Sequence, residues 1–131
     1  MIGLDTNILV RHFMQDDPKQ IGPAAHVMKS LSAAEPGWVG LAVVAELVWV
    51  LKSIYRVERP AIVYVLESLL ASDDCIVEQS ETVLNAVNLY RNRGADFHDC
   101  LIAAGAHAAG CTRVVTFDRA AARDAGMELV S

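Results

Sequence analysis

Short, continuous apolar runs alternate along this chain with longer stretches of helical periodicity. Such runs are typical of parallel strands that are covered on both faces. We predict strands at Met1–Leu4, Trp38–Val39, Cys75–Val77, Val114–Phe117 and Glu128–Val130.

Amphipathic stretches fill the intervals between these strands. Pro60 in a first turn, and Ser80 and Asp96 as N-caps, mark where three of the helices begin. We predict helices at Thr6–Met14, Gln20–Ala33, Ala42–Tyr55, Arg59–Ala71, Glu81–Arg93, Phe97–Ala109 and from Arg119 to about Asp124. The alternation predicts a three-layer α/β/α fold with a small, mostly parallel central sheet.

Composition places the chain among folded, intracellular proteins. It has 131 residues, 53% of them hydrophobic and 21% charged, and no linker or repeat, so we expect one domain over residues 1–131. Its three cysteines are odd in number and lack a C-x-x-C spacing, which favours reduced, buried thiols in the cytoplasm. No targeting segment is visible, and we expect no membrane part.

Glu46 stands alone in an apolar run. From Trp38 to Leu51 the sequence reads WVGLAVVAELVWVL, without a lysine or arginine to pair with the acid. A carboxylate buried in such a segment must shift its pKa, pair with a charge or bind a metal ion. We therefore expect Glu46 to be buried and to have a role in chemistry.

Further acids lie where the strands end. Asp5 and Asp118 each follow a predicted strand, and Asp99 lies in the first turn of a predicted helix, with Asp96 before it. Ligands of open parallel sheets bind beyond the carboxyl ends of the strands. We expect Asp5, Glu46, Asp99 and Asp118 to converge on a divalent cation, although N-cap roles explain Asp5, Asp96 and Asp118 as well.

The donor set favours a hard cation. Clustered carboxylates repel one another, and Mg²⁺ or Mn²⁺ accepts carboxylate oxygens and water, whereas no His or Cys spacing indicates zinc. Thr6, Asn7 and Thr116 are candidates to orient the ligands. The net charge of −5 does not exclude nucleic acid, because without the four acids twelve Asp and Glu remain against eleven Lys and Arg.

Four segments, in this order, resemble PIN-domain proteins, most closely the VapC-type toxins of bacterial toxin–antitoxin pairs. They are DTNILV at Asp5–Val10, AELVWVL at Ala45–Leu51, ADFHDCLIAA at Ala95–Ala104 and VVTFDR at Val114–Arg119. The resemblance covers essentially the whole chain. It implies a Mg²⁺- or Mn²⁺-dependent endoribonuclease whose acidic quartet is Asp5, Glu46, Asp99 and Asp118, with Asp96 as an additional acid.

The resemblance also implies partners and a mechanism. One or two metal ions would activate water for cleavage of an RNA phosphodiester bond. A small antitoxin would cover the acids, and the chain would form a homodimer for which Trp49, Tyr55 and Tyr64 are candidate contacts, unless they are core residues. Candidate RNA contacts are Arg11, Arg91, Arg93 and Arg119.

Other classes fit less well. A receiver-type phosphoacceptor domain needs an acidic pair after the first strand and a late lysine, but MIGLDTN has one acid and no lysine follows Lys52. A haloacid-dehalogenase-like phosphatase needs an aspartate where Asn7 stands. A non-catalytic PIN-fold module that binds protein remains open, because only activity distinguishes it.

Overall fold

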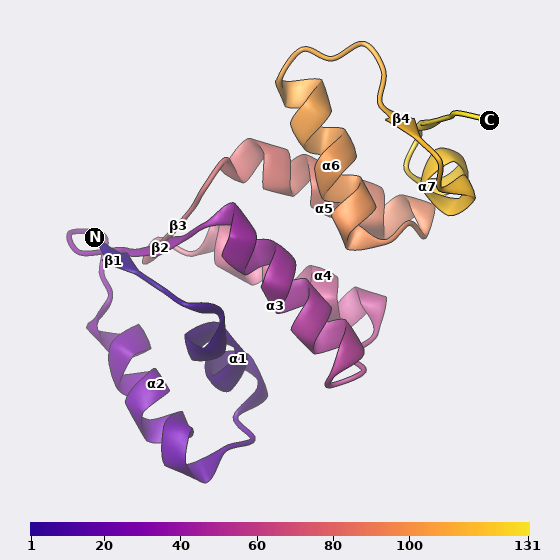
Figure 1. The fold of residues 1–131 in the computed structure, drawn as a ribbon. Coiled ribbons are helices and arrows are strands. Elements are labelled where there is room, and N and C mark those ends of the chain that lie inside the picture. Colours follow the sequence, from indigo (N-terminus) through magenta and orange to yellow (C-terminus); the bar gives the residue numbers. More distant parts are fainter. The chain divides into compact units, whose positions relative to one another are not determined.

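The computed structural model describes residues 1–131 as two compact units, Met1–Glu78 and Gln79–Ser131. We call them the N-terminal and the C-terminal unit and describe each by itself (Figure 1).

The N-terminal unit is built on a three-stranded parallel sheet. Strand β2 (Gly37–Val39) lies between β1 (Ile2–Gly3) and β3 (Cys75–Val77). The register pairs Gly37 with both Ile2 and Cys75. Because all three strands run the same way, the chain must return along helices between them.

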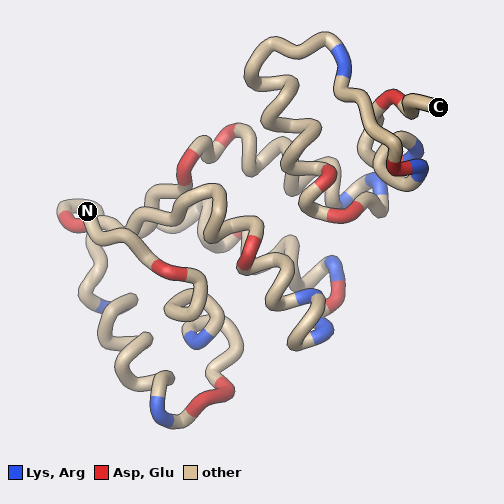
Figure 2. Tube along the Cα trace, in the orientation of Figure 1, with Lys and Arg blue, Asp and Glu red and all other residues tan.

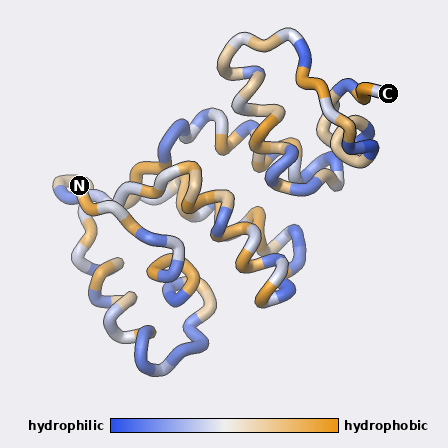
Figure 3. The backbone as a smooth tube through the Cα atoms, in the orientation of Figure 1, coloured by the Kyte–Doolittle hydropathy of each residue, from blue (hydrophilic) through white to orange (hydrophobic).

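Two helices make each return in this unit. Helices α1 (Thr6–Met14) and α2 (Pro18–Ser30) follow β1, and α3 (Leu41–Ser53) and α4 (Arg59–Ala71) follow β2. Hydrophobic positions follow α3 for most of its length (Figure 3). The core of the unit takes its most buried side chains from three of these helices and from β2: Leu9, Val39, Val44, Leu47, Leu51, Ile62 and Leu66.

The C-terminal unit begins with a helical hairpin. Helices α5 (Ser80–Arg93) and α6 (Phe97–Ala108) pack together, and the rings of Tyr90 and Phe97 meet edge to face at 5.5 Å. Gly94 ends α5 with φ +71°, a left-handed conformation that glycine adopts without strain. Strands β4 (Val115–Thr116) and β5 (Glu128–Leu129) then pair in parallel, and helix α7 (Arg119–Asp124) lies between them in the sequence.

The predicted fold class is confirmed: the chain is a helix-rich α/β protein with a small parallel sheet. All five predicted strands are present, and α1, α4 and α7 have the predicted bounds. Helix α2 begins earlier than predicted, because the Asp17 carboxylate caps it by accepting from the Lys19 backbone N–H at 3.0 Å. None of the helices is both long and apolar enough to cross a bilayer.

Two predictions, one about a helix cap and one about a thiol, are wrong. Ser80 is not an N-cap but the first residue of α5, because Gln79 adopts the left-handed conformation and takes the capping position. Cys111 is exposed, unlike Cys75 and Cys100, because it follows the end of α6 in a surface turn. All three thiols are free, as predicted.

Candidate active site

Asp5 and Glu46 line one cleft in the N-terminal unit. The cleft has a volume of about 250 Å³ and lies between the start of α1 and the length of α3. Its other lining residues are Thr6, Asn7, Val10, Arg11, Val50, Ile54 and Tyr55. Two of the predicted acids and both of their predicted polar neighbours thus share one concave surface.

Asp5 is held by the helix that it begins. It lies two residues after β1, and its Oδ1 accepts from the Thr6 backbone N–H at 2.7 Å as the N-cap of α1. Its other carboxylate oxygen accepts no hydrogen bond from the chain. The N-cap interpretation is therefore correct, and it leaves one oxygen of this exposed side chain for a cation.

Glu46 lies in the second turn of α3, as predicted, but it is exposed rather than buried. Helix α3 turns only one face to the core, with Val44, Leu47 and Val48 buried, and Glu46 lies beside that face. The carboxylate makes no hydrogen bond or ion pair within the chain. Because Glu46 is exposed, it does not bear the cost of burial that the sequence suggested. What distinguishes it in the structure is its unpaired position in the cleft.

Glu78 fixes the start of the helix that carries Glu46. The N-cap residue of α3 is Gly40, which has no side chain to cap with, and the Glu78 Oε1 accepts from the Leu41 backbone N–H at 2.8 Å. A carboxylate there also favours the positive end of the helix dipole. The sequence held no local signal for this contact, because the two residues are 37 positions apart.

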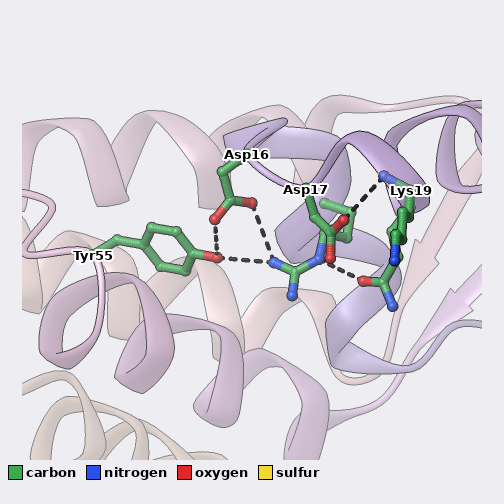
Figure 4. Close-up of polar contacts among 6 residues, drawn as sticks. Asp16, Asp17, Lys19 and Tyr55 are labelled. Carbon is green, nitrogen blue, oxygen red and sulfur yellow. Dashed lines mark hydrogen bonds and ion pairs between the residues drawn. The ribbon is translucent and has the colours of Figure 1, made fainter.

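Arg11 lines the cleft and is tied into a network with Asp16 and Tyr55. Figure 4 labels Asp16 and Tyr55 and marks the hydrogen bond between them with a dashed line. Its Nε donates to Gln20 Oε1 at 2.6 Å, and its Nη1 donates to the Tyr55 hydroxyl at 2.8 Å and to Asp16 Oδ1 at 3.2 Å. The Tyr55 hydroxyl in turn donates to Asp16 Oδ2 at 2.7 Å. The network joins α1, the start of α2 and the residues after α3.

The same network shifts the pKa values of its members. The hydrogen bond from Tyr55 lowers the pKa of Asp16, with a smaller contribution from Arg11, and the bond to Asp16 raises the pKa of Tyr55. Sequence reasoning considered Tyr55 only as an interface or core residue, and it missed the joint role of Tyr55 and Asp16. Contact with RNA by Arg11 stays a prediction.

The C-terminal unit brings three more acids near one another. Asp96 is the N-cap of α6 without a side-chain capping bond, and Asp99 lies in the first turn, half buried. Burial raises the pKa of Asp99, and the negative charges of Asp96 and then Asp118 raise it further. The carboxylates therefore create a negative potential that favours a bound cation.

Asp118 caps α7 as the sequence allowed. Its Oδ1 accepts from the backbone N–H groups of Ala120 and Ala121 at 2.8 and 3.1 Å, and the other oxygen accepts none. The Thr116 Oγ1 accepts from the Asp118 backbone N–H at 3.0 Å. Thr116 thus has the supporting position that was predicted for it.

The donor set fits a hard divalent cation. All five acids offer carboxylate oxygens, the ligands that Mg²⁺ and Mn²⁺ prefer. Within each unit, no group of three or more His, Cys, Asp or Glu side chains is arranged to hold a metal ion. Acidic positions are spread over both units (Figure 2).

Comparison with known proteins shows the family. Residues 2–126 match the family model described as PIN domain, so the chain belongs to the PIN-domain family. The chain is also 32% identical over 117 residues to the VapC ribonuclease of Aquifex aeolicus (strain VF5), an alignment that covers 88% of this chain and 86% of that protein.

Proposed function

We propose that this chain is a metal-dependent endoribonuclease and the toxin of a toxin–antitoxin pair. Membership in the PIN-domain family and the similarity to a VapC ribonuclease support the class of reaction. The observation that carries the proposal is the pair Asp5 and Glu46, two exposed carboxylates in one cleft of which Glu46 has no partner within the chain.

Asp5, Glu46, Asp99 and Asp118 together hold one or two Mg²⁺ or Mn²⁺ ions in this proposal, with Asp96 as a further ligand. A divalent ion in such a site polarises a phosphate and lowers the pKa of bound water. The chain itself positions the carboxylates: capping bonds fix one oxygen of Asp5 and of Asp118, and Thr116 and Asn7 stand beside them. Helix α3 fixes Glu46.

The partners of this site follow from its charge. RNA phosphates and a cluster of carboxylates repel one another, so the phosphates can approach only where cations offset that repulsion. Exposed arginines of the C-terminal unit can supply part of this positive charge: Arg91, Arg93 and Arg119. A small antitoxin is expected to place a basic side chain among the same acids. We expect the RNA and the antitoxin to bind this chain in the cytoplasm. We also expect residues 1–131 to act as a single domain.

A homodimer is part of the same proposal. Trp49 on α3 and Tyr64 on α4 are 52% and 71% exposed, so they are not the core residues that the alternative required. Tyr55 is half buried and engaged with Arg11 and Asp16, which makes it a poorer contact.

The proposal is tested with purified protein and single-stranded and structured RNAs. We expect cleavage with Mg²⁺ or Mn²⁺, none with EDTA, and recovery when the metal is returned in excess. Asp5→Asn should lower the rate by about 100-fold or more, because a metal ligand loses its charge. Cleavage that survives EDTA, or an Asp5→Asn variant as active as the parent, would show that a contaminating nuclease cuts the RNA. The alternative of a non-catalytic module that binds protein would then stand.

A further inference from the structure

A second concave surface in the C-terminal unit contains none of the proposed metal ligands. It is a cavity of about 570 Å³ between α5, α6 and the segments before β4 and β5. The volume lies within the range of about 300–1,000 Å³ that small-molecule sites usually have.

Small residues leave this space open. Ala103 and Ala104 on α6 line it on one side, and Gly126 lines it on another. None of these residues carries a side chain beyond a methyl group, so none of them fills the gap between the helix and the C-terminal segment. The sequence thus builds a hollow where larger apolar residues would have closed the packing.

Three asparagines on α5 face this cavity. Asn85, Asn88 and Asn92 stand at positions i, i+3 and i+7, so they share one face of the helix. All three are exposed, and none of their side chains makes a hydrogen bond within the chain. Asparagine is a poor helix former, and here no intrachain bond offsets that cost.

Only one of the two arginines that line the cavity is paired with an acid. Arg93 and Arg113 line it, and no Asp or Glu does. Arg113 Nη1 lies 3.0 Å from Glu128 Oε1, whereas Arg93 has no ion pair within the chain. In a chain of net charge −5, this is a local surplus of positive charge next to amide groups.

We infer that this cavity binds an unstacked nucleotide of single-stranded RNA, with the Asn85, Asn88 and Asn92 amides on the base and Arg93 on its phosphate. Amides offer donors and acceptors together, as the edges of bases require, and unstacked bases are what proteins read in RNA. A protein partner fits less well, because Trp and Tyr, the usual anchors of protein interfaces, are absent from the lining. The inference rests on the proposed nuclease function and would add a substrate-recognition site to it.

The test uses the intact chain in EDTA, which arrests cleavage, and a short single-stranded oligoribonucleotide of mixed sequence. We expect the side-chain amide NMR signals of the three asparagines to shift saturably as RNA is added. The double variant Asn88→Ala/Asn92→Ala should bind about tenfold more weakly. It should melt no lower than the parent, since alanine is the better helix former. Arg93→Gln should also weaken binding, and Lys19→Gln, an equal charge change in the N-terminal unit, should not.

Unshifted amides together with parental affinity of the double variant would overturn the inference. Inorganic phosphate alone, or duplex RNA, producing the same shifts would also overturn it, because the site would then read charge and not a base. Cleavage with Mg²⁺ is measured on the same variants. If the chain cleaves RNA but binds it independently of the asparagines, only this inference is overturned. If it binds RNA through the asparagines without cleaving it, only the proposed nuclease function is overturned.

Discussion

At the scale of single residues, a carboxylate that caps a helix through one oxygen keeps the other oxygen for a second role. Asp5 and Asp118 each commit Oδ1 to a helix N-terminus and keep the other oxygen unbonded. The choice between a structural and a functional interpretation, which the sequence left open, is therefore not exclusive. A pair of variants separates the two roles.

Asparagine caps a helix about as well as aspartate, whereas alanine does not. We expect Asp118→Asn to keep the melting temperature of the parent and to lose RNA cleavage. Asp118→Ala should lose cleavage equally and also about 1 kcal/mol of the free energy of unfolding. Urea unfolding monitored by circular dichroism gives the second quantity. An active Asp118→Asn variant would mean that this residue only caps α7.

At the scale of elements, long-range contacts position what local patterns predict. The predicted bounds of α1, α4 and α7 match the structure, because caps and apolar periodicity are local signals. The exposure of Glu46 was not predictable from its apolar run, because it depends on which face of α3 meets the core. The Glu78 cap and the Tyr55 network join residues 37 and 39 or more positions apart, beyond any sequence window.

Glu78 tests whether the start of α3 depends on that distant cap. Glu78→Ala should lower the free energy of unfolding by about 1 kcal/mol. The Leu41 N–H would lose its acceptor, and the positive end of the α3 dipole would lose the nearby negative charge. Glu78→Gln keeps an acceptor and should lose less. Equal stability of all three proteins in urea would show that Glu78 does not hold α3.

The Tyr55 hydroxyl tests the second network through pH. Its bond holds the pKa of Asp16 below the ordinary value of 3.8, so the folded state favours ionised Asp16. That contribution to stability is fully present above the unfolded pKa and is lost as the pH falls through the lower, folded one. We expect the Asp16 pKa, followed by NMR of the carboxyl carbon, to rise toward 3.8 in Tyr55→Phe. An unchanged value would exclude this bond.

At the scale of the whole molecule, the account joins acids from both units in one reaction. Family membership is shown over residues 2–126, and the order of four motifs was enough to expect it from the sequence. The joint action of the quartet is a proposal, because the motifs identify the acids without measuring their distances.

The most direct measurement is the rate of Mg²⁺-dependent RNA cleavage by Glu46→Gln, Asp99→Asn and the double variant, with Asp73→Asn, an exposed turn acid, as the control. When several residues serve one reaction centre, the losses of rate caused by their single substitutions do not multiply in the double variant. The account predicts that each single variant loses about 100-fold or more, that the double variant is no worse than the singles, and that the control keeps the parental rate. Parental activity in either single variant, or losses that multiply in the double, would contradict it.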